Sequence, residues 1–182
     1  MSALKILRFP HKNLRKTAPP VMQVDDSLAP TIQQMYATLY GANAWGLAAT
    51  QVNLPLRLFV MDISSEQNQP LCLINPEILE REGSVELEAG CLSFPGIYFN
   101  ISRANKITVK YQDEKGAVQI LTTEGQAAFC IQQQCDYLNG VLFIDYLSNL
   151  KRSRLLKKLQ KYTFDEGHHH GCGEPSCTID HG

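Results

Sequence analysis

Cysteine and histidine, the side chains that most readily bind soft metal ions, are gathered at the C-terminal end of this 182-residue sequence. Four of the five histidines and two of the six cysteines lie in the last fifteen residues. Their composition suits Zn²⁺ or Cu⁺, although their spacing matches no standard zinc finger. Two interpretations stay open, a metal-binding tail and a flexible end without a metal. The six candidate ligands are His168, His169, His170, Cys172, Cys177 and His181.

Three segments in the body of the sequence carry the other candidate functional residues. Residues 46–51 read Gly-Leu-Ala-Ala-Thr-Gln, residues 90–93 read Gly-Cys-Leu-Ser, and residues 133–140 read Gln-Gln-Cys-Asp-Tyr-Leu-Asn-Gly. In their order and their flanking residues, these segments resemble the three motifs of the peptide deformylase family. The resemblance extends over about residues 3–162. It implies an α+β fold, with antiparallel sheets around a central motif helix and a further helix at the C-terminus.

The resemblance also implies roles for single residues. Peptide deformylases hold iron or zinc and hydrolyse the formyl group of N-formylmethionyl peptides. Cys91 stands at the position of the metal-binding cysteine. Gln51 stands at that of the glutamine that stabilises the oxyanion, and Leu92 supplies a backbone N–H to the same oxygen. Gly46, Gln51 and Leu92 are the expected contacts with the substrate.

At the two metal-binding histidines and the general base of the family, this sequence has other residues. Gln133 and Tyr137 replace the histidines, and Gln134 replaces the catalytic glutamate. A carboxamide is a weak neutral ligand with no basic group near neutral pH, and tyrosine binds a metal well only as phenolate. We therefore expect no metal at this site. The predicted function is a catalytically inactive binder of N-terminal Met or formyl-Met peptides near the ribosome.

Two alternatives to an inactive binder stay open. The first is an active metal-dependent deformylase or hydrolase with a relocated metal, for instance one delivered by the tail. The second is a metal-binding protein that acts through its His/Cys tail and uses the fold as a platform. Metal content and an assay with formyl-Met-Ala-Ser distinguish these three functions.

Hydrophobic periodicity indicates the elements that must position these residues. It predicts helices at 25–39, 124–138 and 147–162, and strands at 57–63, 71–75, 106–112 and 117–122. The segment 124–138 has one apolar face, and Cys130, Gln133, Gln134 and Tyr137 lie on the other. Such a pattern alone is typical of a half-solvated helix. The resemblance instead places this helix between sheets, with Gln133 and Tyr137 facing Cys91.

The last predicted helix is strongly basic. A solvated face is one interpretation, and an electrostatic contact with ribosomal RNA is the other. The second gains weight from the resemblance, because deformylases are thought to approach the ribosome through their C-terminal helix. Its six cations in eleven residues are Lys151, Arg152, Arg154, Lys157, Lys158 and Lys161.

Composition limits the remaining possibilities. Apolar residues make up 44% and charged residues 19%, which excludes intrinsic disorder, and the net charge of −1 excludes a generic polyanion binder. No apolar run is long enough to cross a bilayer, and the first residues contain no long apolar stretch, so we expect no secretory signal. We therefore expect a cytoplasmic protein with reduced cysteines and no membrane contact. The expected organisation is one domain over residues 1–165 and a flexible Gly/His/Cys-rich tail over residues 166–182.

Overall fold

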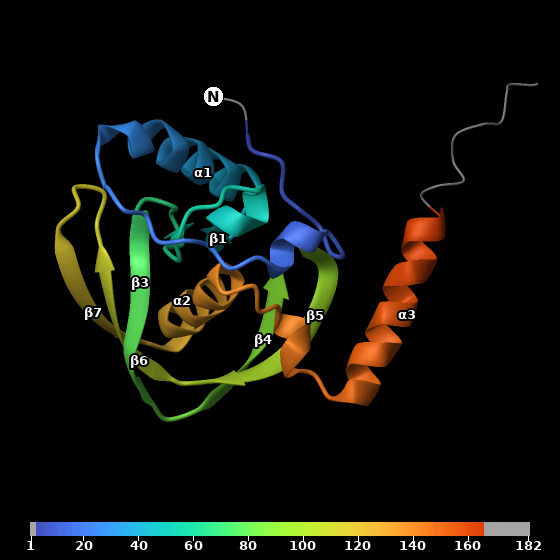
Figure 1. Cartoon of the computed structure of the whole chain (residues 1–182). Helices are drawn as coiled ribbons and strands as arrows, with labels where there is room; N and C mark the ends of the chain where they lie inside the picture. The colour runs from blue at the N-terminus through green and yellow to red at the C-terminus, as the bar shows by residue number, and fades with distance from the viewer. Residues whose placement is uncertain (1–2, 166–182) are drawn as a thin grey trace, which may run out of the picture. The chain divides into compact units, whose positions relative to one another are not determined.

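The computed structural model describes residues 3–165 and has the expected α+β fold (Figure 1). The three α-helices are α1 (Ala29–Gly41), α2 (Gly125–Leu138) and α3 (Asn149–Asp165). Four short 3₁₀ helices are η1 (Lys12–Arg15), η2 (Asp26–Leu28), η3 (Ala49–Val52) and η4 (Phe143–Tyr146). The strands are β1 (Gly46–Ala48), β2 (Leu58–Met61), β3 (Leu71–Glu82), β4 (Val85–Cys91), β5 (Phe94–Arg103), β6 (Lys106–Gln112) and β7 (Val118–Glu124).

The chain divides into two compact units after Tyr146. The first unit holds α1, α2 and all the strands, and within residues 3–165 the second consists of α3 and the short segment before it. The predicted end of the first domain at residue 165 stays a prediction, and the predicted tail lies outside the described residues. No helix in residues 3–165 combines the length and apolar character that crossing a bilayer requires.

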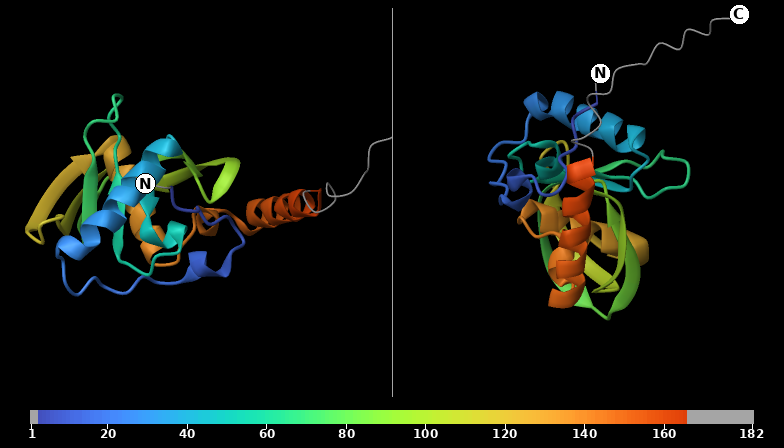
Figure 2. Two further views of the ribbon diagram at one scale, coloured as in Figure 1. Left: turned by 90° about the horizontal axis from the view of Figure 1, so that it is seen from above. Right: turned by 90° about the vertical axis from the view of Figure 1, so that its right-hand side faces the viewer.

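Two antiparallel sheets form the frame of the first unit. One has five strands in the order β1-β2-β3-β6-β7, and the other is the hairpin of β4 and β5. All four residues of β2 are buried, as the run Leu-Phe-Val-Met favours. Helix α2 lies inside this frame, between the large sheet and the β4–β5 hairpin (Figures 1 and 2). The predicted position of the motif helix between sheets is therefore confirmed.

Helix α2 is buried on its polar face as well as on its apolar face. Ten of its fourteen residues are buried, so periodicity alone, which favours a half-solvated helix, is wrong here. The buried amides of Gln132 and Gln133 are tolerated because they find partners. Gln132, for example, donates to the carbonyls of Ala104 and Ala128, at 2.9 and 3.0 Å. The polar face of α2 therefore lies in the interior of the first unit and not at its solvated surface.

The end of α2 is fixed against the N-terminal segment. Gly140 has a φ of +71°, and a Cβ there would collide with the carbonyl group of Arg15. Only glycine combines this left-handed conformation with such a close backbone approach. Arg15 also forms an ion pair with Asp145 at 2.5 Å, and the N–H of Ala18 donates to the carbonyl of Leu138 at 2.8 Å. These contacts hold the segment that precedes α1 against the C-terminal end of α2.

The β4–β5 hairpin and the short strand β1 are not among the strands that periodicity predicts. Strand β4 alternates Val85, Leu87 and Ala89 with glutamates, but the pattern is short and ends at Gly90. Strand β5 contains Pro95 and a glycine, which disfavour a strand. The strand predicted at 71–75 continues to residue 82, because its polar second half pairs with β6.

Candidate active site

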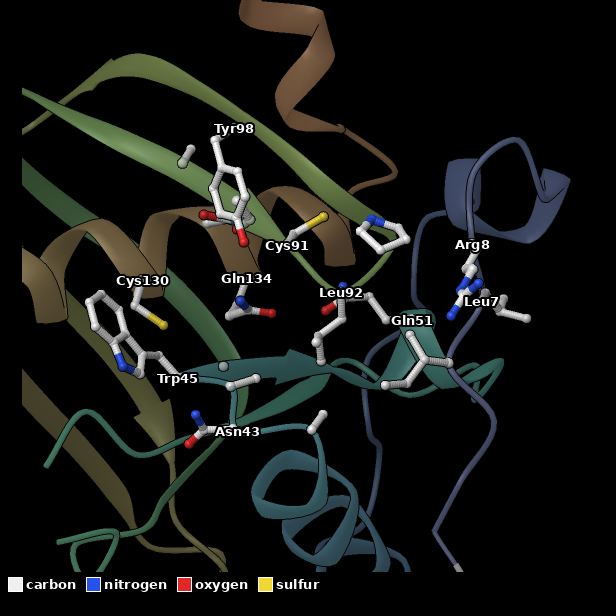
Figure 3. A pocket seen from close by; sticks show the side chains of 18 of the residues that line it. Leu7, Arg8, Asn43, Trp45, Gln51, Cys91, Leu92, Tyr98, Cys130 and Gln134 are labelled. Carbon is white, nitrogen blue, oxygen red and sulfur yellow. The ribbon is translucent and has the colours of Figure 1, made fainter. Parts of the chain in front are cut away.

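A cavity of about 1460 Å³ opens beside α2 in the first unit (Figure 3). Its walls come from the N-terminal segment, the loop before β1, the β4–β5 hairpin and α2. Six of the candidate residues from the three motifs line it, and the seventh, Tyr137, lies behind Cys91. The structure thus brings the three motifs together, as the sequence predicts. The six lining residues are Gly46, Gln51, Cys91, Leu92, Gln133 and Gln134.

Cys91 and Tyr137 form a direct hydrogen bond, with 2.6 Å between the sulfur and the hydroxyl oxygen. An irregularity between Ala89 and Cys91 ends the regular pairing of β4, where the chain turns toward β5. The Tyr137 side chain is fully buried, and burial raises its pKa well above the ordinary value. Burial also raises the pKa of Cys91 to about 11, although the hydrogen bond with Tyr137 opposes the shift. Near neutral pH the pair is therefore a thiol and a phenol, both protonated.

Gln133 lies one turn before Tyr137 on α2 and is also buried. Its amide nitrogen donates to the carbonyl of Gly90, with 3.0 Å between the two atoms. The prediction that Gln133 and Tyr137 face the Cys91 hairpin is met. They bond to that hairpin and not to each other.

The donors at the three family positions do not fit a resident iron or zinc ion. Cys91 is the one usual ligand among them and is bonded to Tyr137, while the Gln133 amide is bonded to Gly90 and burial raises the pKa of the Tyr137 phenol, which opposes phenolate formation. A metal of this kind needs thiolate, imidazole or carboxylate donors. In residues 3–165 no three His, Cys, Asp or Glu side chains are grouped closely enough to hold an ion. The metal predicted at residues 168–181 lies outside the described residues and stays a prediction.

Gln51 is held in one orientation by bonds at both ends of its amide. Its oxygen accepts from the N–H of Ala48 at 3.0 Å, and its nitrogen donates to the hydroxyl of Ser93 at 3.2 Å. Because Ser93 follows Leu92, the bond ties Gln51 to the turn that carries the Leu92 N–H. The two expected oxyanion donors therefore belong to one bonded unit. The sequence pattern predicts no role for Ser93, although this residue stands in the second motif.

Gln134 packs against Cys130 and Gly46. A Cβ at Gly46 would lie 2.7 Å from both the Cys130 sulfur and the Gln134 nitrogen, so this contact requires glycine. Burial raises the pKa of Cys130 to about 12, and the hydrogen bond with Gln134 opposes that shift. Cys130 is thus a neutral thiol beside the amide.

The N-terminal segment also lines the cavity, through Leu4 to Arg8 and His11. The N–H of Leu7 donates to the carbonyl of Gln51 at 2.7 Å. No functional role of this segment could be predicted, because its irregular backbone leaves no periodic signal in the sequence.

Comparison with known proteins identifies the family. The family model described as "Polypeptide deformylase" matches residues 3–153. The peptide deformylase 1 of Pseudomonas syringae pv. tomato is 48% identical over 162 residues, which is 88% of this chain and 96% of the relative. The peptide deformylase of Pseudoalteromonas translucida is 47% identical over 161 residues, again 88% of this chain and 96% of the relative.

Solved structures agree with the sequence comparison. A peptide deformylase from Legionella pneumophila superimposes with a TM-score of 0.85 at 42% identity and covers 92% of this chain and 99% of its own. That from Thermotoga maritima gives a TM-score of 0.77 at 44% identity and covers 81% of this chain and 99% of its own.

These relatives correct the function expected from the sequence. Chains that are 47–48% identical over 88% of this one are named peptide deformylase, which supports an active deformylase and contradicts a catalytically inactive binder. The expectation of an inactive binder depends on three substitutions in α2, whereas the similarity to proteins named peptide deformylase extends over 88% of the chain. The expectation of no metal also conflicts in part with a family that uses iron or zinc. This chain belongs to the polypeptide deformylase family.

Proposed function

We propose that this chain hydrolyses the formyl group of N-formylmethionyl peptides in the cavity beside α2. The observation that carries the proposal is the bonded unit of Gln51, Ser93 and the Leu92 turn at the cavity wall. It retains the two donors that a formyl oxyanion requires, on a frame shared with proteins named peptide deformylase.

The reaction needs four things from the chain's own residues. Strand β1 is at the end of the strand order, so its outer edge is available to the backbone of an extended peptide. Apolar side chains such as Ile6, Leu7 and Phe129 suit an N-terminal methionine. Water adds to the formyl carbon while Gln51 and the Leu92 N–H donate to the developing oxyanion. The proton that the water loses passes through solvent to the nitrogen, the C–N bond breaks, and formate and the free amine leave.

We also propose that no metal is held by the residues at positions 91, 133 and 137, so no step is assigned to one. Gln134 cannot accept a proton near neutral pH, and a positioned general base is worth about 10²–10⁴-fold in rate. Loss of the base alone should therefore lower kcat/KM about 10²–10⁴-fold relative to a deformylase with the family's own base.

Formate release from formyl-Met-Ala-Ser tests this function. The wild-type chain is expected to release formate faster than buffer does. Gln51→Leu removes one oxyanion donor and should lower kcat/KM at least tenfold. Gln119→Leu is the matched control, because Gln119 is exposed on β7 and does not line the cavity. Formate release equal to that of buffer at every peptide concentration would contradict the proposal.

We also propose the partners and the cellular location of the reaction. Its partners are the N-termini of newly made peptides, and the ribosome remains a proposed partner through the basic helix α3. The cytoplasm, where such peptides are made, is the proposed location.

A further inference from the structure

Gln134 presents a buried hydrogen-bond acceptor to the cavity. Its side chain is 4% exposed, and its amide oxygen has no hydrogen-bond partner. Among the described residues that line the cavity, no other has a buried side-chain oxygen or nitrogen in this state. In Figure 3 this oxygen points away from Cys130 and toward Leu92.

The surroundings of Gln134 fix which end of the amide faces the cavity. The nitrogen lies against Cys130 and the backbone of Gly46, where even a Cβ would approach it to 2.7 Å. The nitrogen end of the amide is therefore fixed in place, and the oxygen can accept a hydrogen bond from a ligand in the cavity.

A buried carbonyl without a donor lowers stability, so the site favours a ligand that brings an N–H or O–H group. The side chains around this oxygen carry no charge: Cys130 and Gln133 are neutral. The lysine, arginine, histidine and glutamate side chains that line the cavity are all exposed, namely Lys5, Arg8, His11 and Glu88. A neutral donor therefore suits Gln134 better than an ammonium group, which would need a buried counter-charge.

We propose that the Gln134 oxygen accepts a hydrogen bond from the N–H of the substrate's N-terminal formamide, so that the cavity selects N-acylated methionyl peptides over peptides with a free α-ammonium group. The inference rests on the function proposed above. In a trans amide the oxygen and the N–H point in opposite directions. The formamide oxygen is then directed to Gln51 and Leu92, and its N–H to α2. A residue that replaces the family's general base acts here in substrate selection.

Peptide binding can be followed through Trp45, the only tryptophan of the chain, which lines the cavity and is 55% exposed. Three peptides are titrated, and the fluorescence amplitude is read before turnover. They are formyl-Met-Ala-Ser, its analogue methylated at the formamide nitrogen, and Met-Ala-Ser. The wild-type chain is expected to bind the first at least tenfold more tightly than the other two.

Gln134→Met removes the acceptor at nearly constant length and should abolish the difference between the formyl peptide and its N-methyl analogue. Gln119→Met, on the exposed face of β7 and outside the cavity, is the matched control and should keep the difference. The comparison of peptides on the wild-type chain remains decisive if a variant does not fold.

The outcomes separate this inference from the proposed function. If the N-methyl analogue binds the wild-type chain as tightly as the formyl peptide, the role of Gln134 is wrong while the proposed function stands. If Met-Ala-Ser binds as tightly as the formyl peptide, the selection for acylated N-termini is wrong. If formyl-Met-Ala-Ser neither changes the fluorescence of Trp45 nor releases formate, the proposed function fails as well.

Discussion

At the residue scale, the positions that would bind a metal in the family have become a neutral hydrogen-bonded group. The Tyr137 hydroxyl bonds to the Cys91 sulfur at 2.6 Å, and the Gln133 amide bonds to the Gly90 carbonyl at 3.0 Å. Each new side chain has a partner on the hairpin, so the substitutions are compatible with one another. Together they exchange metal-binding donors for direct contacts between α2 and the β4–β5 hairpin.

Restoring the family's residues in α2 should restore metal binding. We expect the triple variant Gln133→His, Gln134→Glu, Tyr137→His to hold about one iron or zinc ion, because Cys91 and the helix are still in register. Its kcat/KM for formyl-Met-Ala-Ser should rise at least about 10²-fold, the lower limit for the base alone. Elemental analysis and formate release measure the two effects. Each single replacement should leave the metal content unchanged, since the ligands and base act as one unit. A triple variant without metal would contradict this account of the site.

At the scale of elements, the turn that follows α2 brings the backbone of Gly140 close to that of Arg15. Gly140→Ala forces a side chain into a left-handed conformation and against the Arg15 carbonyl. We expect the free energy of unfolding to fall by at least about 1–3 kcal/mol. Gly41→Ala is the control. A Cβ added at Gly41 would meet no atom within 4 Å outside its own helix turn, and alanine is a better helix former than glycine. Urea denaturation measures both variants, and an equal effect at the two positions would show that the contact at Gly140 is unimportant.

The elements can be predicted where periodicity is strong. Helix α2 and strand β6 lie within one residue of their predicted bounds, because their apolar positions repeat regularly. The β4–β5 hairpin could not be predicted, because glutamates, Pro95 and glycines interrupt its pattern while long-range pairing holds it together. Likewise, motif spacing predicts that Gln133 and Tyr137 face Cys91. It could not predict the bond from Tyr137 to the sulfur or the clamp on Gln134, because side-chain orientation depends on neighbours distant in sequence.

The basic helix α3 carries a separate prediction about the ribosome. Replacing the exposed Lys151, Arg154 and Lys157 with glutamine should weaken binding to ribosomes. The slope of log affinity against log salt concentration should become shallower by about one for each phosphate that the helix no longer neutralises. Replacing Lys106, Lys110 and Lys115, which lie outside α3, removes the same charge and serves as the control. Co-sedimentation at several salt concentrations measures the effect. Equal affinities for the two variants would exclude a specific role of α3.

At the scale of the whole molecule, buried thiols couple stability to pH. Burial raises the pKa of Cys130 and of Cys135 to about 12, and it also raises that of Cys72, against an ordinary value of about 8.5. The folded chain therefore keeps protons that the unfolded chain has lost above pH ~8.5. Below that pH these thiols make their full contribution to the free energy of unfolding. The contribution falls as pH rises toward 12, by at most about 1.4 kcal/mol per pH unit for each thiol.

Urea denaturation at pH 8, 9 and 10 with a reducing agent measures this decline. The double variant Cys130→Ala, Cys135→Ala should show a shallower decline, because two of the contributing thiols are removed. A free energy of unfolding that stays constant or rises between pH 8.5 and pH 10 would rule out these buried, protonated thiols.

The central claim, that one cavity both binds and deformylates formyl-methionyl peptides, is tested most directly on the formyl carbon itself. Carbon NMR of ¹³C-formyl-Met-Ala-Ser with an equimolar amount of wild-type chain reports that carbon alone. We predict a shifted or broadened formyl signal on mixing, followed by its replacement by the signal of free formate. Both changes should be weaker or slower with Gln51→Leu. A formyl signal that keeps its position and its intensity in the presence of the wild-type chain would contradict the account.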